Sequence, residues 1–287
     1  MNRGYVFVKL PKTGLGNMLL VWARGYVFAH KNQLPFFTSN WWSIRPGVWI
    51  RNEKRKRFYW GYFKNDSLIN KLRLYFIKRG NQLFIEPSKP NISGKFLYQF
   101  STCDTDGDYF KSLKPYRTEV KKALYALLTN KIRRQLDNAN VPVIGMHIRR
   151  GDFKLGSALT PLQYFIDCLQ AIRRVAGTDL PATIFSDADE DELKEILRFP
   201  GVNLSNQKAD ILDILLLSKS KICILSISST FSFWAAFLSD GVILKHPDEW
   251  HPAIRPHNID TYLFEGHFDP LLPIEKDVAD YIMRIND

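Results

Sequence analysis

Residues 143–152 read VIGMHIRRGD, and the rest of the chain is organised around this stretch. Its β-forming residues, 143–147, follow Pro142 and predict a short buried strand. Two arginines, a glycine and a carboxylate come directly after that strand. Because open α/β sheets bind ligands at the carboxyl ends of their strands, we expect these polar groups at a binding edge.

The chain alternates between strands and helices after residue 140. The pattern predicts strands at 143–147, 182–185, 221–225 and 242–244, and helices at 161–175, 189–197, 211–217 and 230–238. Such alternation is typical of a parallel sheet that helices cover on both faces. The polar stretch 137–140 has the composition of a linker. We therefore expect two domains, residues 1–140 and residues 141–287.

The first half of the chain carries weaker signals. Strands are predicted at 5–10 and 96–100, and helices at 18–31 and 118–136. Gly14 and Gly16 lie in a turn before the first helix, and Asn17 is expected to cap that helix. A strand, a glycine turn and a helix can present backbone N–H groups to an anion, although a tight turn without a ligand is more common.

Basic charge is concentrated in one part of the chain. Lys and Arg exceed Asp and Glu by 11 in the 287 residues, and the segment from Arg51 to Arg79, with ten basic residues against two acidic ones, contributes +8 of this excess. This segment is either a solvated face or a surface for peripheral membrane or glycolipid contact, where each basic residue adds about 1 kcal/mol. A nucleic-acid-binding protein is the alternative, but no recognised motif accompanies the charge, so we expect no nucleic acid as partner.

The cysteines and the apolar segments favour a cytoplasmic protein. Cys103, Cys168 and Cys223 have neither disulfide-framework nor metal-site spacing, which indicates a reducing compartment and no structural zinc. The apolar run at the amino terminus is too short for a secretion signal. Serines interrupt the apolar segment 222–238, so a strand, a turn and a helix fit it better than a membrane span.

Aromatic residues are frequent between residues 35 and 62. The tryptophans there are Trp41, Trp42, Trp49 and Trp60. Such rings can form a platform for a sugar, but burial in a core is the commoner fate of tryptophan. The sequence leaves both interpretations open.

Three polar turns follow predicted strands and would meet at one edge of the sheet. Arg149 or Arg150 can neutralise a diphosphate, because a guanidinium grips phosphate through two parallel hydrogen bonds; the alternative is an ion pair within the turn. Ser228, Ser229 and Thr230 open a helix whose first N–H groups favour a second phosphate contact or are simply capped.

Two further polar residues belong to these strand ends. Asp187 follows the second predicted strand, where it can accept hydrogen bonds from the paired donors of guanine or cap the next helix. His147 ends its strand, and a lone histidine there is more often a hydrogen-bonded structural residue than a base or a ligand. We see no second histidine at metal-site spacing.

Four motifs together resemble one known family. They are Gly14-Leu15-Gly16-Asn17, HIRRGD at 147–152, Phe185-Ser186-Asp187 and SSTFSFWAA at 228–236. In order and approximate spacing they look like those of glycosyltransferase family 11, the alpha-1,2-fucosyltransferases. HIRRGD is shared with related alpha-1,6 and protein O-fucosyltransferases, and the serine-phenylalanine-tryptophan motif makes the resemblance specific.

The resemblance implies a fold and an activity. The fold is GT-B, an α/β class in which two Rossmann-like domains face a cleft, and we expect the last helix to pack back on the amino-terminal domain. The activity is inverting transfer of L-fucose from GDP-fucose to a hydroxyl of an acceptor oligosaccharide or glycolipid, through an alpha-1,2 linkage and with no metal or other cofactor. An alpha-1,6 linkage or another GDP-sugar is the alternative. A bacterial enzyme of lipopolysaccharide or O-antigen biosynthesis, in the cytoplasm or at the inner face of the membrane, fits this activity.

The resemblance also implies roles for residues. Arg149 would contact the diphosphate and Asp187 the guanine, while Ser229, Thr230 and Phe231 would line the phosphates. The other substrate-binding candidates lie in the same motifs, and they are Gly14, Gly16, Asn17, His147, Arg150, Ser186 and Ser228.

The sequence departs from the family's pattern in places. Glycine, glutamine, asparagine and tryptophan are usual where this chain has Thr13, Met18, Ser228 and Phe233. Alpha-1,6 relatives carry a glutamate shortly after the arginine motif, and this chain does not. Asp152 is the nearest carboxylate and our candidate for the catalytic base, the alternative being that it orients Arg149 or Arg150.

Overall fold

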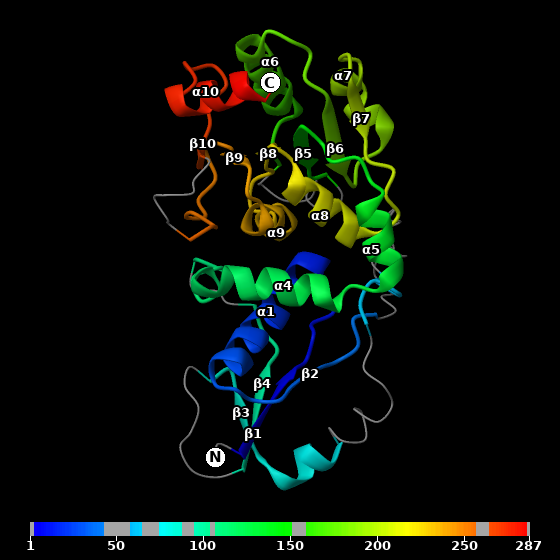
Figure 1. Ribbon diagram of the computed structural model, residues 1–287, viewed down its shortest axis with the longest axis vertical. Coiled ribbons are helices and arrows are strands. Elements are labelled where there is room, and N and C mark those ends of the chain that lie inside the picture. The colour runs from blue at the N-terminus through cyan, green and yellow to red at the C-terminus, as the bar shows by residue number, and fades with distance from the viewer. Residues whose placement is uncertain are drawn as a thin grey trace. The chain divides into compact units, whose positions relative to one another are not determined.

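The structure is a computed structural model that describes residues 3–42, 58–64, 75–87, 95–103, 107–150, 159–256 and 264–285. The chain divides into two compact units. The first consists of Met1–Arg51 and Lys56–Arg133, and the second of Asn52–Arg55 and Arg134–Asp287. Each contains a parallel sheet with helices (Figure 1), which confirms the predicted α/β fold class.

The sheet of the first unit has the strand order β2-β1-β4-β3. Its strands are β1 (Arg3–Val8), β2 (Phe36–Thr38), β3 (Gln82–Ile85) and β4 (Lys95–Phe100). All of them pair in parallel, and β1 and β4 confirm the two strands that the sequence predicts. Helix α1 (Leu15–Lys31) packs on this sheet so closely that a side chain at Gly25 would overlap Val8.

Helix α1 begins earlier than the sequence predicts. Its first residue is Leu15 and its N-cap is Gly14, which makes no side-chain capping hydrogen bond. The prediction that Asn17 caps this helix is therefore wrong. Burial is the reason, because Leu15 and Met18 are already buried and the apolar face extends one turn further back.

The helix predicted at 118–136 is in fact two helices, α4 (Arg117–Leu127) and α5 (Asn130–Asp137). Leu128 separates them, because its backbone is extended and pairs with Phe63 in an isolated antiparallel bridge. The side chain of Leu128 is fully buried. Tertiary packing at this residue thus outweighs the helical periodicity of the segment.

The sheet of the second unit has the strand order β10-β9-β8-β5-β6-β7. Its strands are β5 (Ile144–Ile148), β6 (Ala182–Ser186), β7 (Val202–Leu204), β8 (Ile222–Ile224), β9 (Val242–Lys245) and β10 (Glu265–His267). All neighbours pair in parallel. Strand β5 lies inside the sheet with every residue buried, as the opening stretch predicts.

The helices described in the second unit are α6 (Leu162–Ala176), α7 (Lys194–Leu197), α8 (Asp210–Lys219), α9 (Thr230–Leu238) and α10 (Lys276–Arg284). The predictions of α6, α8 and α9 are confirmed. The helix predicted at 189–197 begins instead as a 3-10 helix, Glu190–Leu193, that leads into α7. Asp189 and Glu192 form a capping box at its start, so Asp187 is not its cap.

Helix α10 packs against α6 of the same unit (Figure 1). Val278 and Ile282, one helical turn apart, are its buried residues, and both belong to the core around α6. The expected packing of the last helix on the amino-terminal domain stays a prediction. This apolar pair completes the core of the second unit.

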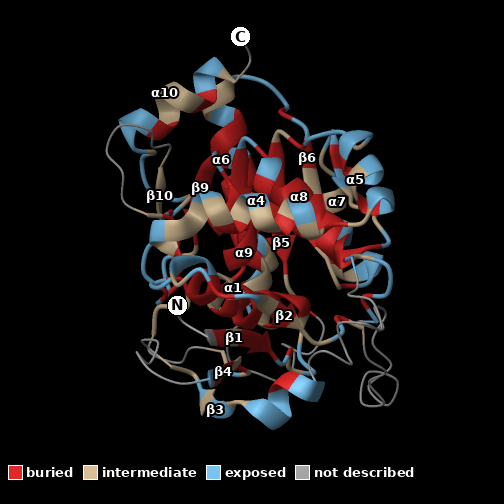
Figure 2. Cartoon of the chain, turned by 60° about the horizontal axis from the view of Figure 1, so that its bottom comes forward, coloured by how far each residue is buried: buried red, intermediate tan, exposed pale blue. Residues whose placement is uncertain are grey.

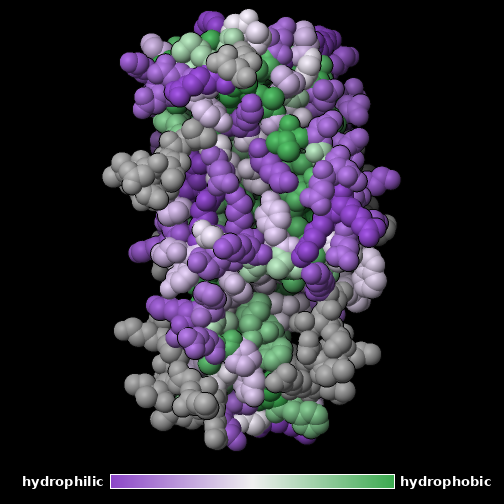
Figure 3. Space-filling model, viewed as in Figure 1, coloured by the Kyte–Doolittle hydropathy of each residue, from purple (hydrophilic) through white to green (hydrophobic). Residues whose placement is uncertain are grey.

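Nearly all residues of β5, α8 and α9 are buried (Figure 2), and hydrophilic side chains predominate in the upper part of the face drawn in Figure 3. The apolar segment 222–238 forms β8, a serine turn and α9, as predicted. None of the helices in the described part of the chain combines the length and the hydrophobicity of a membrane span.

Candidate functional site

The carboxyl ends of β5, β6 and β8 bring polar turns together. Nη1 of Arg149 lies 2.8 Å from Oδ2 of Asp187. The backbone N–H of Arg149 donates to Oγ of Ser226 at 2.9 Å, and this hydroxyl donates to the carbonyl of His147 at 2.7 Å. These bonds join the ends of β5 and β8. They hold the backbone of Arg149 in place while its side chain stays 19% exposed.

Strand register explains why Arg149 and Asp187 are in contact. Ile148 of β5 pairs with Ser186 of β6, so the next residue of each strand leaves the sheet beside the other. The structure thus pairs the two side chains, and their expected roles, Arg149 at the diphosphate and Asp187 at the guanine, stay predictions. The first residues beyond two neighbouring parallel strands lie side by side when the strands are in register. The sequence pattern does not give this register, so the contact was not predicted.

Asp187 and Ser186 also organise the turn itself. Oδ1 of Asp187 accepts a hydrogen bond from the backbone N–H of Arg150 at 2.8 Å. The hydroxyl of Ser186 donates to the carbonyl of Ile148 at 2.6 Å and accepts from the N–H of Ala188 at 3.0 Å. Both side chains therefore tie the end of β6 to the end of β5.

The two neighbouring arginines have different surroundings. The side chain of Arg150 is buried, and its Nη1 donates to the carbonyls of Arg149 at 3.0 Å and Thr160 at 2.8 Å. Burial lowers the pKa of Arg150, and the Glu192 and Asp187 carboxylates oppose that shift. Arg150 thus holds the turn, and Arg149 is the partly exposed guanidinium of the pair.

His147 is part of a buried polar contact between β5 and α9. Its Nδ1 lies 2.6 Å from Oγ of Ser232, and its ring stacks on Phe231 with centroids 4.6 Å apart. Ser232 is fully buried, and its Oγ also accepts from the N–H of Ser226 at 3.2 Å. These contacts fit the structural role that the sequence left open for His147, and they place Phe231 beside it.

The start of α9 has an unusual backbone. Ser229 is the N-cap and Thr230 the first helical residue, as the sequence predicts, but Ser229 makes no side-chain capping bond. Ser228 has a φ of 52°, in the left-handed region that is costly for a residue other than glycine. Its N–H donates to Oε2 of Glu249 at 2.7 Å, and its Oγ accepts from the indole N–H of Trp250 at 2.9 Å.

Glu249 and Trp250 were not recognised from the sequence. Glu249 is 4% exposed, and its Oε1 also accepts from the N–H of His251 at 2.9 Å. Its contact with Ser228 spans 21 residues of chain, so no local pattern reports it. The available signal was the run of polar and aromatic residues that follows the predicted strand at 242–244.

Ser228→Asn should raise the free energy of unfolding by about 0.5–1 kcal/mol, because asparagine tolerates the left-handed region better than serine. The amide oxygen of asparagine can still accept from Trp250. Urea unfolding followed by fluorescence measures the change. Ser112→Asn is the matched control, since Ser112 is exposed and outside the residues with positive φ. A variant at 228 that is no more stable than the control variant would contradict the strain at Ser228.

The glycine turn belongs to the first unit. Gly14 caps α1, and Gly16 and Asn17 lie in its first turn. The thiol of Cys103 contacts the carbonyl of Asn17, with Sγ 3.7 Å from the oxygen. This turn therefore has the strand–turn–helix layout that the sequence predicts.

The aromatic residues of the first unit differ in exposure. Trp41 is buried and packs against Phe63, with ring centroids 4.1 Å apart and ring planes tilted by 34°, which is the core role. Trp60 is 60% exposed and lies beside Phe58 and Trp42, with centroids 6.2 and 5.4 Å away.

Several predicted residues lie outside the described ranges. They are Gly151 and Asp152 of the arginine motif, Trp49, and the parts of the Arg51 to Arg79 segment at 51–57 and 65–74. Of the residues that the structure does describe, no three His, Cys, Asp or Glu side chains form a group that could hold a metal ion.

Sequence comparison decides the family. The model of glycosyl transferase family 11 matches residues 92–250, slightly more than half of the chain. The chain belongs to glycosyltransferase family 11. The matched part of this family 11 chain runs from the region of β4 to Trp250, and so contains the Arg149, Asp187 and Ser228 turns. No curated protein shows significant sequence similarity to it.

Solved structures share the fold of this family 11 chain. A structure of the alpha-1,6-fucosyltransferase NodZ soaked with GDP-fucose superposes with a TM-score of 0.51 at 15% identity, over 85% of this chain and 96% of that one; NodZ has also been solved from Bradyrhizobium. A mutant of Arabidopsis thaliana FUT1 in complex with GDP gives a TM-score of 0.51 at 14% identity, over 90% of this chain and 72% of that one. At such identity the likeness shows the fold.

Proposed function

We propose that this family 11 enzyme transfers L-fucose from GDP-fucose to a hydroxyl of an acceptor oligosaccharide or glycolipid, with inversion, without a metal and through an alpha-1,2 linkage. The observation that carries the proposal is the Arg149 guanidinium at the carboxyl edge of the second sheet. Its backbone is held by Ser226 and its Nη1 by Asp187. A guanidinium fixed in this way suits a diphosphate that gains charge as it leaves.

The start of α9 supplies the second contact of the proposed diphosphate site. The first N–H groups of a helix and its positive dipole end favour an anion. Ser229 and Thr230 lie at this end, directly after the Ser228 turn. Arg149 and α9 follow the neighbouring strands β5 and β8, so the charges that stabilise the leaving group come from two adjacent strand ends.

Asp187 can recognise guanine without releasing Arg149. Each of its oxygens accepts one hydrogen bond within the turn, Oδ1 from the Arg150 N–H and Oδ2 from Arg149. A carboxylate offers about four lone-pair sites, which leaves capacity for the guanine ring N–H and amino group.

The reaction proceeds by in-line displacement. The acceptor oxygen attacks the anomeric carbon, the bond from that carbon to the phosphate oxygen breaks, and GDP leaves with the bonding electrons beside Arg149. The hydroxyl proton passes to a base, for which we propose Asp152. The alternative role of Asp152, orientation of the arginines, predicts a milder loss on Asp152→Asn.

Incubation with GDP-fucose, GDP-mannose and UDP-sugars, with a panel of galactoside acceptors, tests the function. Of these donors, we expect only GDP-fucose to release its nucleotide, and only when an acceptor is present. EDTA should not change the rate. NMR of the product should show an alpha-1,2 linkage with inverted configuration. An alpha-1,6 product would correct the linkage only. Release from another donor alone, or salt-sensitive oligonucleotide binding without affinity for GDP, would overturn the proposal.

A further inference from the structure

Trp250 is an exposed aromatic residue, and the residues before and after it in the sequence are buried. It is 53% exposed, whereas Glu249 is 4% and His251 1% exposed. The indole of Trp250 is nevertheless fixed by its contacts. Its N–H donates to Oγ of Ser228 at 2.9 Å, and its ring lies 5.6 Å from the ring of His251, which packs on Phe233.

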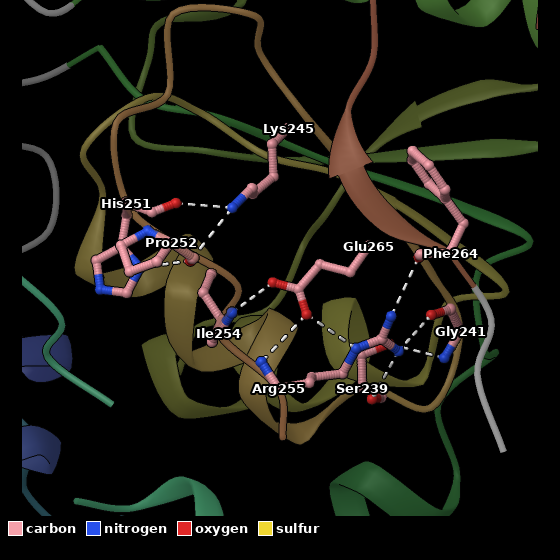
Figure 4. Close-up of polar contacts among 9 residues, drawn as sticks. All are labelled: Ser239, Gly241, Lys245, His251, Pro252, Ile254, Arg255, Phe264 and Glu265. Carbon is pink, nitrogen blue, oxygen red and sulfur yellow. Dashed lines mark hydrogen bonds and ion pairs between the residues drawn. The ribbon is translucent and has the colours of Figure 1, made fainter. Parts of the chain in front are cut away.

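The segment that carries Trp250 is held from both sides. Nζ of Lys245 donates to the carbonyls of His251 at 2.8 Å and Pro252 at 3.2 Å (Figure 4). The carboxylate of Glu249 accepts from the N–H groups of Ser228 and His251, and its carbonyl accepts from His267 Nε2 at 2.7 Å. Trp250 is therefore presented on a rigid support at the strained turn before α9.

Strand order relates Trp250 to the proposed donor site. The strands run β9-β8-β5-β6, with Asp187 after β6, Arg149 after β5, the start of α9 after β8 and Trp250 after β9. With guanine at Asp187 and the diphosphate between Arg149 and α9, the next group along the donor is its sugar. That sugar lies on the side of Trp250.

We propose that Trp250 is the stacking surface for the sugar ring of the bound nucleotide sugar, with Ser228 and Glu249 as the positioning residues that fix its indole. The inference rests on the proposed function, because it assumes a GDP-sugar bound at this edge. A 6-deoxyhexose suits the surface, since its methyl group and C–H bonds give it an apolar side for an aromatic ring. The indole then distinguishes GDP-sugar from GDP.

Trp250→Ala and Trp250→Phe separate the ring from its hydrogen bond. We expect Trp250→Ala to raise the KM for GDP-fucose about tenfold, which is the size of a lost aromatic contact. The Kd for GDP should stay within about twofold of the wild-type value. Trp250→Phe keeps a ring without the N–H and should stay within about threefold for both. Leu271→Ala, at an 81% exposed apolar residue of the same unit, is the control and should change neither constant.

The possible results distinguish a failure of the role proposed for Trp250 from a failure of the proposed function. Equal weakening of GDP and GDP-fucose by Trp250→Ala would mean that Trp250 acts only through the Ser228 turn, and a change in the acceptor KM alone would place it against the acceptor. Either result, or no change at all, overturns the inference while the function stands. A wild-type protein that neither binds GDP nor uses GDP-fucose overturns the proposed function instead.

Discussion

Arg149→Lys should lower the kcat of fucose transfer by about 100- to 1,000-fold, which is the usual loss when one preorganised donor to a developing negative charge is removed. Lysine keeps the positive charge and can keep the ion pair with Asp187. It cannot reproduce the planar fork that grips two phosphate oxygens at once. Initial-rate kinetics with GDP-fucose measure the loss.

Arg174→Lys is the matched control for that variant. Arg174 lies in the last turn of α6 and is exposed, so the same exchange there should leave kcat unchanged. Circular dichroism and urea unfolding of both variants show that any loss is not a folding defect. Wild-type kcat in folded Arg149→Lys would remove the leaving-group role from Arg149.

Glu265→Ala should destabilise the second unit by about 3–5 kcal/mol, because it leaves a buried guanidinium without its counter-charge. The side chains of Glu265 and Arg255 are 6% and 4% exposed, and Oε2 of Glu265 lies 3.2 Å from Nε of Arg255. The same carboxylate accepts from the N–H groups of Ile254 and Arg255 (Figure 4). The Arg255 guanidinium also donates to the carbonyls of Gly241 and Phe264.

Asp179→Ala is the control for this buried pair. Asp179 forms an ion pair with Arg173 at 3.4 Å, but it is 67% exposed, so its loss should cost less than about 1 kcal/mol. Urea unfolding measures both variants. Similar losses at 265 and 179 would show that burial does not set the strength of the Glu265 contact. Glu265→Ala should also loosen the segment that carries Trp250, since Ile254 and Arg255 end that segment.

The elements that the sequence predicts well are those with long local patterns. Strand β5, with its polar carboxyl end, and the helix α9 after the serine turn are found where the residues indicate. Strands β3, β7 and β10 are three or four residues long, and each forms because a neighbouring strand offers pairing. Most of their residues are exposed or half-buried, so they lack the pattern of a fully buried strand that reveals the equally short β8 and β9.

The candidate site was likewise predictable only in part. Arg149, Asp187 and the start of α9 follow predicted strands, so their common edge was predictable from the alternation of elements. The contact between Arg149 and Asp187 depends on strand register, and that between Ser228 and Glu249 on the path of the chain after β9. Both contacts depend on the tertiary structure, so the pattern of residues along the chain does not predict them.

A crystal structure of the protein with GDP bound would locate the nucleotide. We expect the diphosphate within hydrogen-bonding distance of the Arg149 guanidinium and of the first N–H groups of α9, with guanine at Asp187. GDP bound elsewhere on the second unit, or in this place with Arg149 turned away from both phosphates, would contradict it.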